Sequence, residues 1–310
     1  MISISATNNF PAPIALFVYN RPIHTRKLIE SLLENIESKD TQLFIFSDAA
    51  KDKNSIDSVE KVRAYVNKIS GFKSITIIPA EHNKGLANSL IDGISYVLER
   101  NYRVIVLEDD LVVSPYFLRY MNSGLDVYRD EKQVASIHGY CYPTMQIEAD
   151  TFFLRGADCW GWATWRRAWN YFESDGQKLL SMLEQAGLMK KFDLDGAYPY
   201  VRMLKDQIKG KNNSWAIRWH ASCFIKNMMT LYPAVSLVQN IGNDNSGTHC
   251  SVTNAFDVVL ANHPIQVKKI EVRENMEARN QVAIFFKYER SLFRRVWSKL
   301  KIFLLKLGFE

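Results

Sequence analysis

Residues 104–115 read VIVLEDDLVVSP, and this stretch decides the fold. Four apolar residues lead into Glu108, Asp109 and Asp110, and a mostly apolar run follows them. A short apolar run of this kind is typical of a buried strand. Three adjacent carboxylates repel one another. We therefore predict a strand over residues 102–107 that carries an acidic cluster at its carboxyl end.

Three earlier segments also read as a strand followed by a helix. The apolar runs PIALFV, QLFIF and SITIIP precede segments with helical spacing, at 13–18 and 24–36, 42–46 and 55–69, and 74–79 and 86–99. Apolar strands joined by helices of about 10–15 residues indicate a parallel sheet covered on both faces. The sequence therefore predicts an α/β fold of Rossmann type.

Polar residues follow each predicted strand. In sheets of this type, ligands bind outside the carboxyl ends of the strands. We therefore expect one crevice to be lined by Tyr19, Asn20 and Arg21, by Ser47 and Asp48, by the EHNKG segment with Asn83 and Lys84, and by Glu108, Asp109 and Asp110.

The crevice has no glycine-rich phosphate loop. Neither GxGxxG nor GxxxxGK[ST] occurs at the strand ends, so backbone amides of such loops are not available for phosphate. A divalent cation held by carboxylates neutralises phosphate instead, and Mg²⁺ and Mn²⁺ prefer oxygen ligands. We therefore predict that the acidic cluster holds Mn²⁺ or Mg²⁺. A merely solvated acidic loop is the alternative.

Composition and charge narrow the class of protein. The chain is 47% hydrophobic and 23% charged, which is typical of a folded protein and excludes disorder. No secretory leader is visible and the four cysteines lack CxxC spacing, so we expect a cytoplasmic protein with reduced thiols. Residues 287–310 hold seven basic and two acidic residues, 7 − 2 = +5 of the net +6. The nearly neutral remainder argues against nucleic-acid binding.

The C-terminal segment has its own pattern. Within residues 285–310, SLFRRVWSKLKIFLLKLGF spaces apolar residues three and four apart, with basic residues between them. This predicts an amphipathic helix that lies on an anionic membrane, at the inner face of the plasma membrane. A helix docked on the protein's own core, or one bound by a calmodulin-like partner, are the alternatives.

These residues resemble a known family. VIVLEDD resembles the metal-binding DXD-type motif of glycosyltransferases with the GT-A fold, in the EDD form of the N-acetylglucosaminyltransferases that initiate complex N-glycans. IALFVYNRP and EHNKGLANSLIDGI are similar to the nucleotide-binding portions of that fold and of bacterial family 2 enzymes. The resemblance covers residues 13 to about 250 and implies a parallel-centred sheet with flanking helices.

The resemblance implies roles for the strand-end residues. Asp110 would ligate Mn²⁺ or Mg²⁺ at the diphosphate of a nucleotide sugar, most simply a UDP- or GDP-sugar. Glu108 and Asp109 would contact ribose, sugar or metal-bound water, and Asp48 the base or ribose. The other expected donor-binding residues are Tyr19, Asn20, Arg21, Asn83 and Lys84, although ordinary surface charge is an equal alternative for Arg21 and Lys84.

A tryptophan-rich segment suggests the acceptor site. Residues 152–169, FFLRGADCWGWATWRRAW, hold four tryptophans. Aromatic faces pack well on ring-shaped ligands. Trp160 and Trp162, which flank Gly161, are the predicted acceptor platform, while the helical spacing of Trp165 and Trp169 predicts core residues.

An inverting transfer needs a general base, usually Asp or Glu. The resembled enzyme carries its base in a WDDW motif, but residues 215–219 read WAIRW here. The remaining candidates are Asp206 and Asp158, each with a plain alternative as a helix-surface or turn acid. A retaining transfer would need no such base.

A second metal ligand is expected near the end of the domain. Residues 228–250 read as two strands and a loop that ends near His249. In enzymes of the resembled fold a C-terminal histidine completes the metal sphere, which implies that role for His249. His138 and His220 are predicted to be structural.

Together these features predict a metal-dependent, inverting hexosyl- or N-acetylhexosaminyltransferase. We expect a glycan acceptor that is carried on a lipid, in the synthesis of cell-surface polysaccharide or glycoconjugate. The expected domain covers 1–250, with a donor half (1–110) and an acceptor half (111–250), followed by an extension (251–284) and the tail (285–310). The alternatives are a sugar-1-phosphate nucleotidyltransferase, disfavoured by VYNRP after the first strand, and an inactive membrane-docked scaffold.

Overall fold

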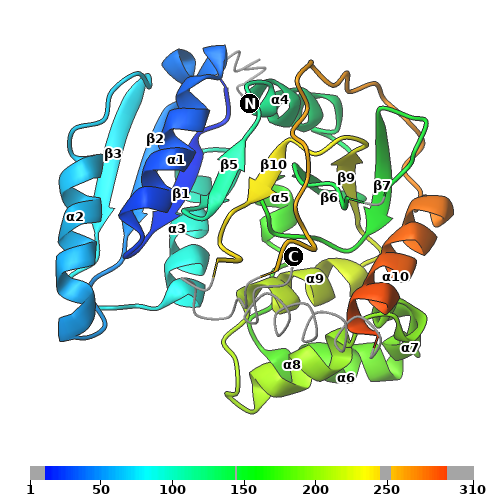
Figure 1. Ribbon diagram of the computed structural model, residues 1–310. Coiled ribbons are helices and arrows are strands. Elements are labelled where there is room, and N and C mark those ends of the chain that lie inside the picture. Colours follow the sequence, from blue (N-terminus) through cyan, green and yellow to red (C-terminus); the bar gives the residue numbers. More distant parts are fainter. Residues whose placement is uncertain (1–10, 144, 245–252, 292–310) are drawn as a thin grey trace, which may run out of the picture.

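A mixed eight-stranded sheet forms the centre of the protein (Figure 1). The computed structural model describes residues 11–143, 145–244 and 253–291. The strand order is β3-β2-β1-β4-β8-β6-β9-β7. The first four are parallel neighbours and match the four predicted strands: β1 (Ile14–Val18), β2 (Gln42–Ser47), β3 (Ser74–Pro79) and β4 (Arg103–Glu108).

Two strands in the second half of the sheet, β8 and β7, run opposite to the others. β8 (Trp162–Trp165) pairs antiparallel with both β4 and β6 (Val134–His138). β9 (Met229–Pro233) is parallel to β6, and β7 (Thr151–Arg155) closes the edge antiparallel to β9. The predicted α/β sheet with flanking helices is therefore confirmed, with a parallel half that carries the acidic cluster.

Helices cover both faces, as the apolar strands predict. Ile14, Leu16 and Val18 of β1 share one core cluster with α1 (Pro22–Leu33), α2 (Ile56–Val66) and α4 (Phe117–Val127). Ala15 and Phe17 join the other cluster, with α3 (Leu86–Arg100), α5 (Arg166–Trp169) and α9 (Trp215–Ile225). Successive side chains of a strand point to opposite faces, so both faces of β1 are buried.

A helical subdomain lies beside the second half of the sheet (Figure 1). α6 (Gly176–Gln185), α7 (Met189–Phe192) and α8 (Tyr200–Ile208) share a third core cluster with α9. The short 3₁₀ helices are η1 (Ile36–Asp40), η2 (Lys53–Ser55) and η3 (Leu194–Gly196).

The last described helix, α10 (Met276–Arg290), docks on the core. Phe285 and Phe286 are only 4% and 5% exposed, and Arg279 pairs with Asp195 at 2.8 Å. The expected tail boundary at residue 285 is therefore wrong for the first residues of the tail, because the docked helix continues to Arg290. Residues 292–310, which hold most of the predicted amphipathic segment, lie outside the described residues.

A small two-stranded sheet leads into the site. β5 (Leu111–Val113) follows the acidic cluster directly and pairs antiparallel with β10 (Val238–Asn240). This pairing brings the chain after residue 240 next to the carboxyl end of β4. Within the described ranges, no helix is both long and apolar enough to cross a membrane.

Candidate functional site

The carboxyl ends of the four parallel strands lie next to one another at one edge of the sheet. The backbone N–H of Asp48 donates to the carbonyl oxygen of Val18 at 3.1 Å, and the N–H of Ala80 donates to that of Ser47 at 2.9 Å. The N–H of Tyr19 donates to Oδ2 of Asp109 at 3.2 Å. The loops after β1, β2, β3 and β4 therefore lie side by side, as the strand pattern predicted.

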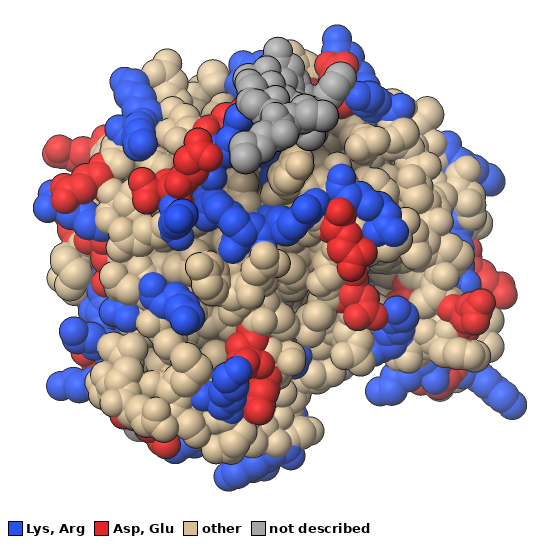
Figure 2. Space-filling model, turned by 180° about the vertical axis from the view of Figure 1, so that it is seen from behind, with Lys and Arg blue, Asp and Glu red and all other residues tan. Residues whose placement is uncertain are grey.

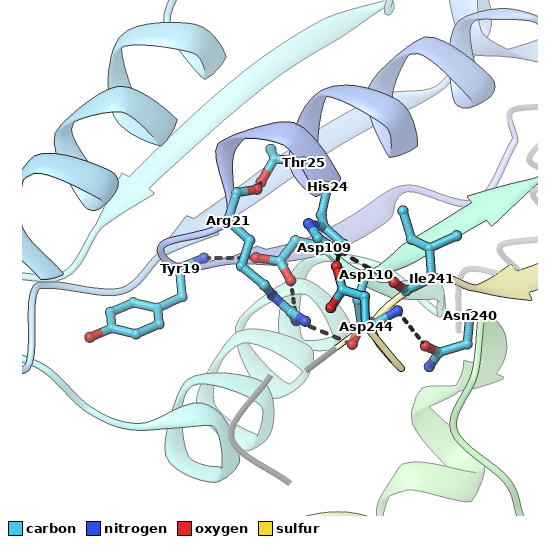
Figure 3. Close-up of polar contacts among 10 residues, drawn as sticks. Tyr19, Arg21, His24, Thr25, Asp109, Asp110, Asn240, Ile241 and Asp244 are labelled. Atoms are coloured by element: carbon cyan, nitrogen blue, oxygen red, sulfur yellow. Dashed lines mark hydrogen bonds and ion pairs between the residues drawn. The ribbon is translucent and has the colours of Figure 1, made fainter. Parts of the chain in front are cut away.

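Arg21 is the counter-ion of the acidic cluster (Figure 3). Its Nη2 lies 2.6 Å from Oδ1 of Asp109 and 3.1 Å from Oδ2 of Asp110. Asp109 is buried, whereas Asp110 and Arg21 keep 16% and 19% of their side chains exposed. One guanidinium thus bridges two carboxylates that arrive from the neighbouring strand.

The cluster has more negative charge than Arg21 neutralises. Burial, with the charges of Asp110 and Asp109, raises the pKa of Glu108 to about 8. Burial also raises the pKa of Asp109 to about 6, against the opposing effect of Arg21. Burial by itself lowers the pKa of Arg21, but the two aspartates outweigh it and the pKa rises. A further cation at this edge would therefore stabilise the ionised carboxylates.

Glu108 predicts a pH dependence for the metal-free protein. The pKa of Glu108 is higher in the folded than in the unfolded chain. The stability that neutral Glu108 contributes is therefore fully present below about pH 4.5, and it is lost as the pH rises through about 8. In EDTA at pH 8.5, Glu108→Gln should raise the melting temperature by about 3 °C, because glutamine cannot ionise. Differential scanning fluorimetry between pH 5 and 9 measures this, with the gain shrinking towards pH 5.

Glu60→Gln on the exposed side of α2 is the matched control, and it should leave the pH profile unchanged. An E108Q protein that melts below the wild type at pH 8.5 would contradict the inference that the ionised Glu108 carboxylate destabilises the folded protein.

The loop after β10 packs against Asp110. The N–H of Ile241 donates to the Asp110 carbonyl oxygen at 2.8 Å. Nε2 of His24 lies 3.1 Å from Oδ2 of Asp244 and 3.3 Å from the Ile241 carbonyl oxygen. A Cβ at Gly242 would come within 2.5 Å of Oδ2 of Asp110. Only glycine therefore allows the loop to approach the carboxylate this closely.

The sequence pattern missed His24 and Asp244. His24 lies one helical turn after Arg21 on α1, on the same side of the helix, and that spacing was the available signal. Asp244 falls in the Asn- and Gly-rich run before residue 245. The expected ligand His249 lies outside the described residues.

The donor set fits a hard divalent cation that is only partly held by protein. Among the residues that the structure describes, no group of three or more His, Cys, Asp or Glu side chains is arranged as a metal site. Mg²⁺ and Mn²⁺ sites that act on phosphates often use one or two carboxylates, with water and phosphate oxygens as the remaining ligands. Asp110, partly exposed beside a second carboxylate, matches that limited role.

Asp48 is saturated by protein hydrogen bonds. Its carboxylate accepts the backbone N–H groups of Ala49, Lys84 and Gly85, each at 2.9 Å, and Nδ2 of Asn83 at 3.2 Å. An ionised carboxylate has about four acceptor positions, so none is left over. Asp48 thus fixes the loop after β3 and the start of α3, where Gly85 has φ +71°.

The remaining donor candidates lie on either side of this loop. The Oη atom of Tyr19 accepts the Lys51 N–H at 3.0 Å, and Nζ of Lys84 pairs with Asp92 at 2.8 Å. Asn20 is partly buried between Tyr19 and Arg21. A cavity of about 460 Å³ opens beside the loop, lined in part by Asn83, Lys84 and Tyr96.

Trp162 does not belong to an acceptor platform. Its side chain is 0% exposed and stacks on Trp215 with the ring centroids 5.6 Å apart, beside Trp169 and Trp219. The prediction for Trp162 is therefore wrong, because residues of β8 alternate into a core that the tryptophans of α9 complete. Trp165 and Trp169 are buried, as predicted.

Trp160 keeps a partly exposed ring. The ring meets Tyr140 and Phe256 edge-on, at centroid distances of 4.8 and 5.4 Å. Gly161 follows with φ +63° and packs against Val238 and Leu107. Trp160 therefore lies close to the carboxyl end of β4.

Asp158 is a partly buried carboxylate among tyrosines. Oη of Tyr142 donates to its Oδ2 at 2.9 Å, and the N–H of Cys159 donates to its Oδ1 at 2.9 Å. Burial raises the pKa of the Cys159 thiol, and the charges of Asp158, Glu108 and Asp110 raise it further. Cys159 thus lies within electrostatic range of both Asp158 and the acidic cluster.

Asp206 has a different setting. It lies on α8, with 30% of its side chain exposed, and pairs with Arg202 and Lys211 at 3.8 Å each. These are contacts of a helix-surface acid. His138 is buried and His220 is partly buried, and burial lowers the pKa of both, which agrees with the predicted structural roles.

Part of the chain matches a known protein family, and the fold is similar in outline to solved structures. Residues 14–181 match the family model described as glycosyl transferase family 2. No curated protein sequence matches the chain. A mannosyltransferase, PcManGT from Pyrobaculum calidifontis in complex with GDP-Man and Mn²⁺, has a TM-score of 0.35 and 12% identity over 58% of this chain and 48% of its own. This chain therefore spans about half the length of that protein.

A UDP-glucose pyrophosphorylase complexed with UDP-glucose has a TM-score of 0.36 and 13% identity, over 72% of this chain and 90% of its own. At these TM-scores the two structures are similar to this chain in outline, and neither bears on its substrate.

Proposed function

This chain belongs to glycosyl transferase family 2, and we propose that it moves a hexose or N-acetylhexosamine from a UDP- or GDP-sugar to a glycan acceptor, with Mn²⁺ or Mg²⁺. The observation that carries the proposal is the Asp109–Arg21–Asp110 bridge at the edge where four parallel strand ends meet. This edge is the position at which open α/β sheets bind their ligands.

We assign the donor diphosphate to the side of Asp110 and Arg21. A divalent cation bound there would neutralise the diphosphate, which makes it a better leaving group. Asp110 is the partly exposed carboxylate and would hold the cation, while Asp109 is buried and keeps Arg21 oriented. Asp48, already saturated, acts by positioning the loop that carries Asn83 and Lys84.

We assign the acceptor to the tyrosine-lined surface near Asp158. Trp160 offers a partly exposed ring there, and Tyr142 holds the Asp158 carboxylate in place at 2.9 Å. Asp158 would accept the proton of the acceptor hydroxyl. The hydroxyl oxygen then forms its bond to the anomeric carbon as the bond to the diphosphate oxygen breaks, and the nucleoside diphosphate leaves with that electron pair. Attack from the opposite side inverts the anomeric centre.

The α10 helix supports this surface. Phe286 contacts both Tyr142 and Tyr198, at centroid distances of 5.4 and 4.5 Å. Arg279 pairs with Asp195, which has φ 55° in the turn before Tyr198. A backbone in this region is strained for a non-glycine residue, and the ion pair with the largely buried Arg279 holds it there. The C-terminal extension therefore belongs structurally to the acceptor side.

A thermal-shift screen tests the function. One UDP- or GDP-sugar, at about a hundredfold its dissociation constant, should raise the melting temperature by about 5 °C with Mn²⁺ present. The same sugar in EDTA should give little shift, because the diphosphate would then meet uncompensated carboxylates. No shift with any nucleotide sugar, with or without metal, would refute the proposal and leave the inactive scaffold.

We further propose that residues 292–310 bind an anionic membrane surface and that the acceptor is carried on a lipid. The support is the interleaving of basic and apolar residues in that segment. A chain that ends at Ser291 keeps all of α10, so it should melt like the full chain. In sedimentation with phosphatidylglycerol vesicles, the full chain should pellet and the shorter chain should stay in the supernatant. Equal pelleting would show that the segment is not the anchor.

A further inference from the structure

A second cavity, of about 710 Å³, lies at the opposite edge of the sheet from the acidic cluster. Its lining includes Pro13 just before β1, Gln42 at the start of β2 and Arg103 at the start of β4. We call it the amino-edge pocket. Because parallel strands begin at one edge and end at the other, this pocket is separate from the proposed donor site.

The amino-edge pocket is strongly basic. Only one acid, Asp40, contributes to its described lining, against six cations: Lys73, Arg100, Arg103, Arg129, Arg166 and Arg167. The back of the molecule shows a band of Lys and Arg side chains (Figure 2). Like charges gathered around a hollow attract an anion of matching charge.

Two of the arginines are fixed by neutral partners. Arg166 donates to the carbonyl oxygens of Leu98, Glu99 and Asn101, the last two at 3.0 and 3.2 Å. Arg167 donates to those of Arg129, Val134 and Tyr128 at 2.8–2.9 Å. Carbonyl oxygens orient a guanidinium without cancelling its charge, so both groups are held in place and remain cationic.

Acids outside the lining balance the other cations only in part. Arg103 and Arg129 share Asp126, and Arg100 pairs with Glu99. Six cations minus Asp40, Asp126, Glu99 and the two acids near Arg167, Asp130 and Glu131, leave 6 − 5 = +1. Burial lowers the pKa of Arg167, and the charges of Asp130 and Glu131 do not offset this effect. The pocket therefore retains net positive charge.

We propose that the amino-edge pocket binds the phosphate group of a small phosphorylated ligand, at a site separate from the donor. Its volume is in the range of small-molecule sites, which is about 300–1,000 Å³, and exceeds what a phosphate alone needs. Tyr102, part of the lining and 70% exposed, lies with its ring 5.0 Å from the Arg166 guanidinium and would contact the body of the ligand. The phosphate can belong to a free metabolite or to a lipid headgroup.

The test measures binding of inorganic pyrophosphate to the full chain by isothermal titration calorimetry. EDTA is present throughout, so that the carboxylates of the donor edge repel the probe. The double variant Arg100→Gln, Arg129→Gln removes two cations whose side chains are 51% and 47% exposed, which spares the fixed pair Arg166 and Arg167. It should weaken binding about tenfold, from the loss of two charge contacts.

A matched control removes the same charge elsewhere. Lys61→Gln, Arg202→Gln replaces cations on α2 and α8 that are 62% and 83% exposed, and it should bind pyrophosphate like the wild type. Equal weakening in both double variants would reduce the effect to net charge and overturn the site. Absence of pyrophosphate binding to the wild type, together with unchanged vesicle binding in the first variant, would overturn it as well.

Vesicles distinguish the two sources of phosphate. If the pocket holds a lipid headgroup, the Arg100→Gln, Arg129→Gln variant should pellet less with phosphatidylglycerol vesicles than the control variant does, in the full chain with residues 292–310 present. If the ligand is a free metabolite, the two variants should pellet equally and differ only in pyrophosphate affinity.

Discussion

Asp110→Asn should lower the rate of sugar transfer by about a thousandfold, the size of effect expected when the group that stabilises the leaving diphosphate is lost. Asp110 is the partly exposed carboxylate at the end of β4, and Gly242 lets the loop after β10 approach it to within contact. Asparagine keeps the shape of the side chain but removes the charge that binds a cation. Initial rates at saturating donor and Mn²⁺ measure the loss.

Stability separates this effect from misfolding. The acidic cluster is short of positive charge, so removing one carboxylate should leave the melting temperature of the metal-free protein unchanged or higher. The Mn²⁺-dependent shift given by the donor should disappear in the same variant. Asp57→Asn, on the exposed side of α2 and paired with Lys61, is the control and should transfer at the wild-type rate. An Asp110→Asn enzyme within threefold of that rate would remove Asp110 from the mechanism.

Arg21 holds the two aspartates of the acidic cluster together and leaves them with different roles. Its guanidinium bridges Asp109 and Asp110, and this bridge keeps two buried or partly buried acids at one strand end. A cation that takes an oxygen of Asp110 competes with this bridge, whereas Asp109, which is also held by the Tyr19 N–H, can keep its contact with Arg21. Asp109 would thus orient Arg21, whereas Asp110 would bind the cation.

The sequence predicted the parallel half of the fold because its signals are local. Each apolar run from β1 to β3 is followed by a helical pattern, and the acidic cluster begins at Glu108, the last residue of β4. The second, mixed half of the sheet was harder to predict, since the order β8-β6-β9-β7 depends on pairing between strands that are far apart in the chain. Burial of Trp162 is a consequence of that pairing.

The site was predicted in part, for a related reason. Placement at the strand ends follows from the direction of the strands, so Arg21 and the acidic cluster were found. The hydrogen-bond partners of each carboxylate oxygen come from segments that are distant in the sequence, and no local pattern shows them. The Asp48 carboxylate is saturated by the loop after β3, and His24 reaches Asp244 only because β10 pairs with β5. The sequence therefore predicted where these residues lie in the fold, but not which hydrogen bonds and ion pairs they form.

The choice of general base rests on Asp158 and Asp206. Asp158→Asn should lower transfer by about a hundredfold or more, the range expected for loss of a positioned base. Asp206→Asn should have little effect, because Asp206 forms long ion pairs, with Arg202 and Lys211 at 3.8 Å, on the surface of α8. Tyr142→Phe, which removes the hydrogen bond that orients Asp158, should lower transfer about tenfold. Transfer to acceptor is measured alongside donor binding.

A measurement of donor binding shows whether a variant has lost the general base or has lost the donor site. Asp158 acts on the acceptor hydroxyl, so the Asp158→Asn protein should show the full Mn²⁺-dependent thermal shift with the nucleotide sugar. A loss of that shift would place Asp158 in the donor site or in the fold. A large loss of transfer in Asp206→Asn, with Asp158→Asn active, would reverse the assignment. If both variants kept the wild-type rate, neither acid would be the base, and an inverting mechanism with a carboxylate base from these two positions would be excluded.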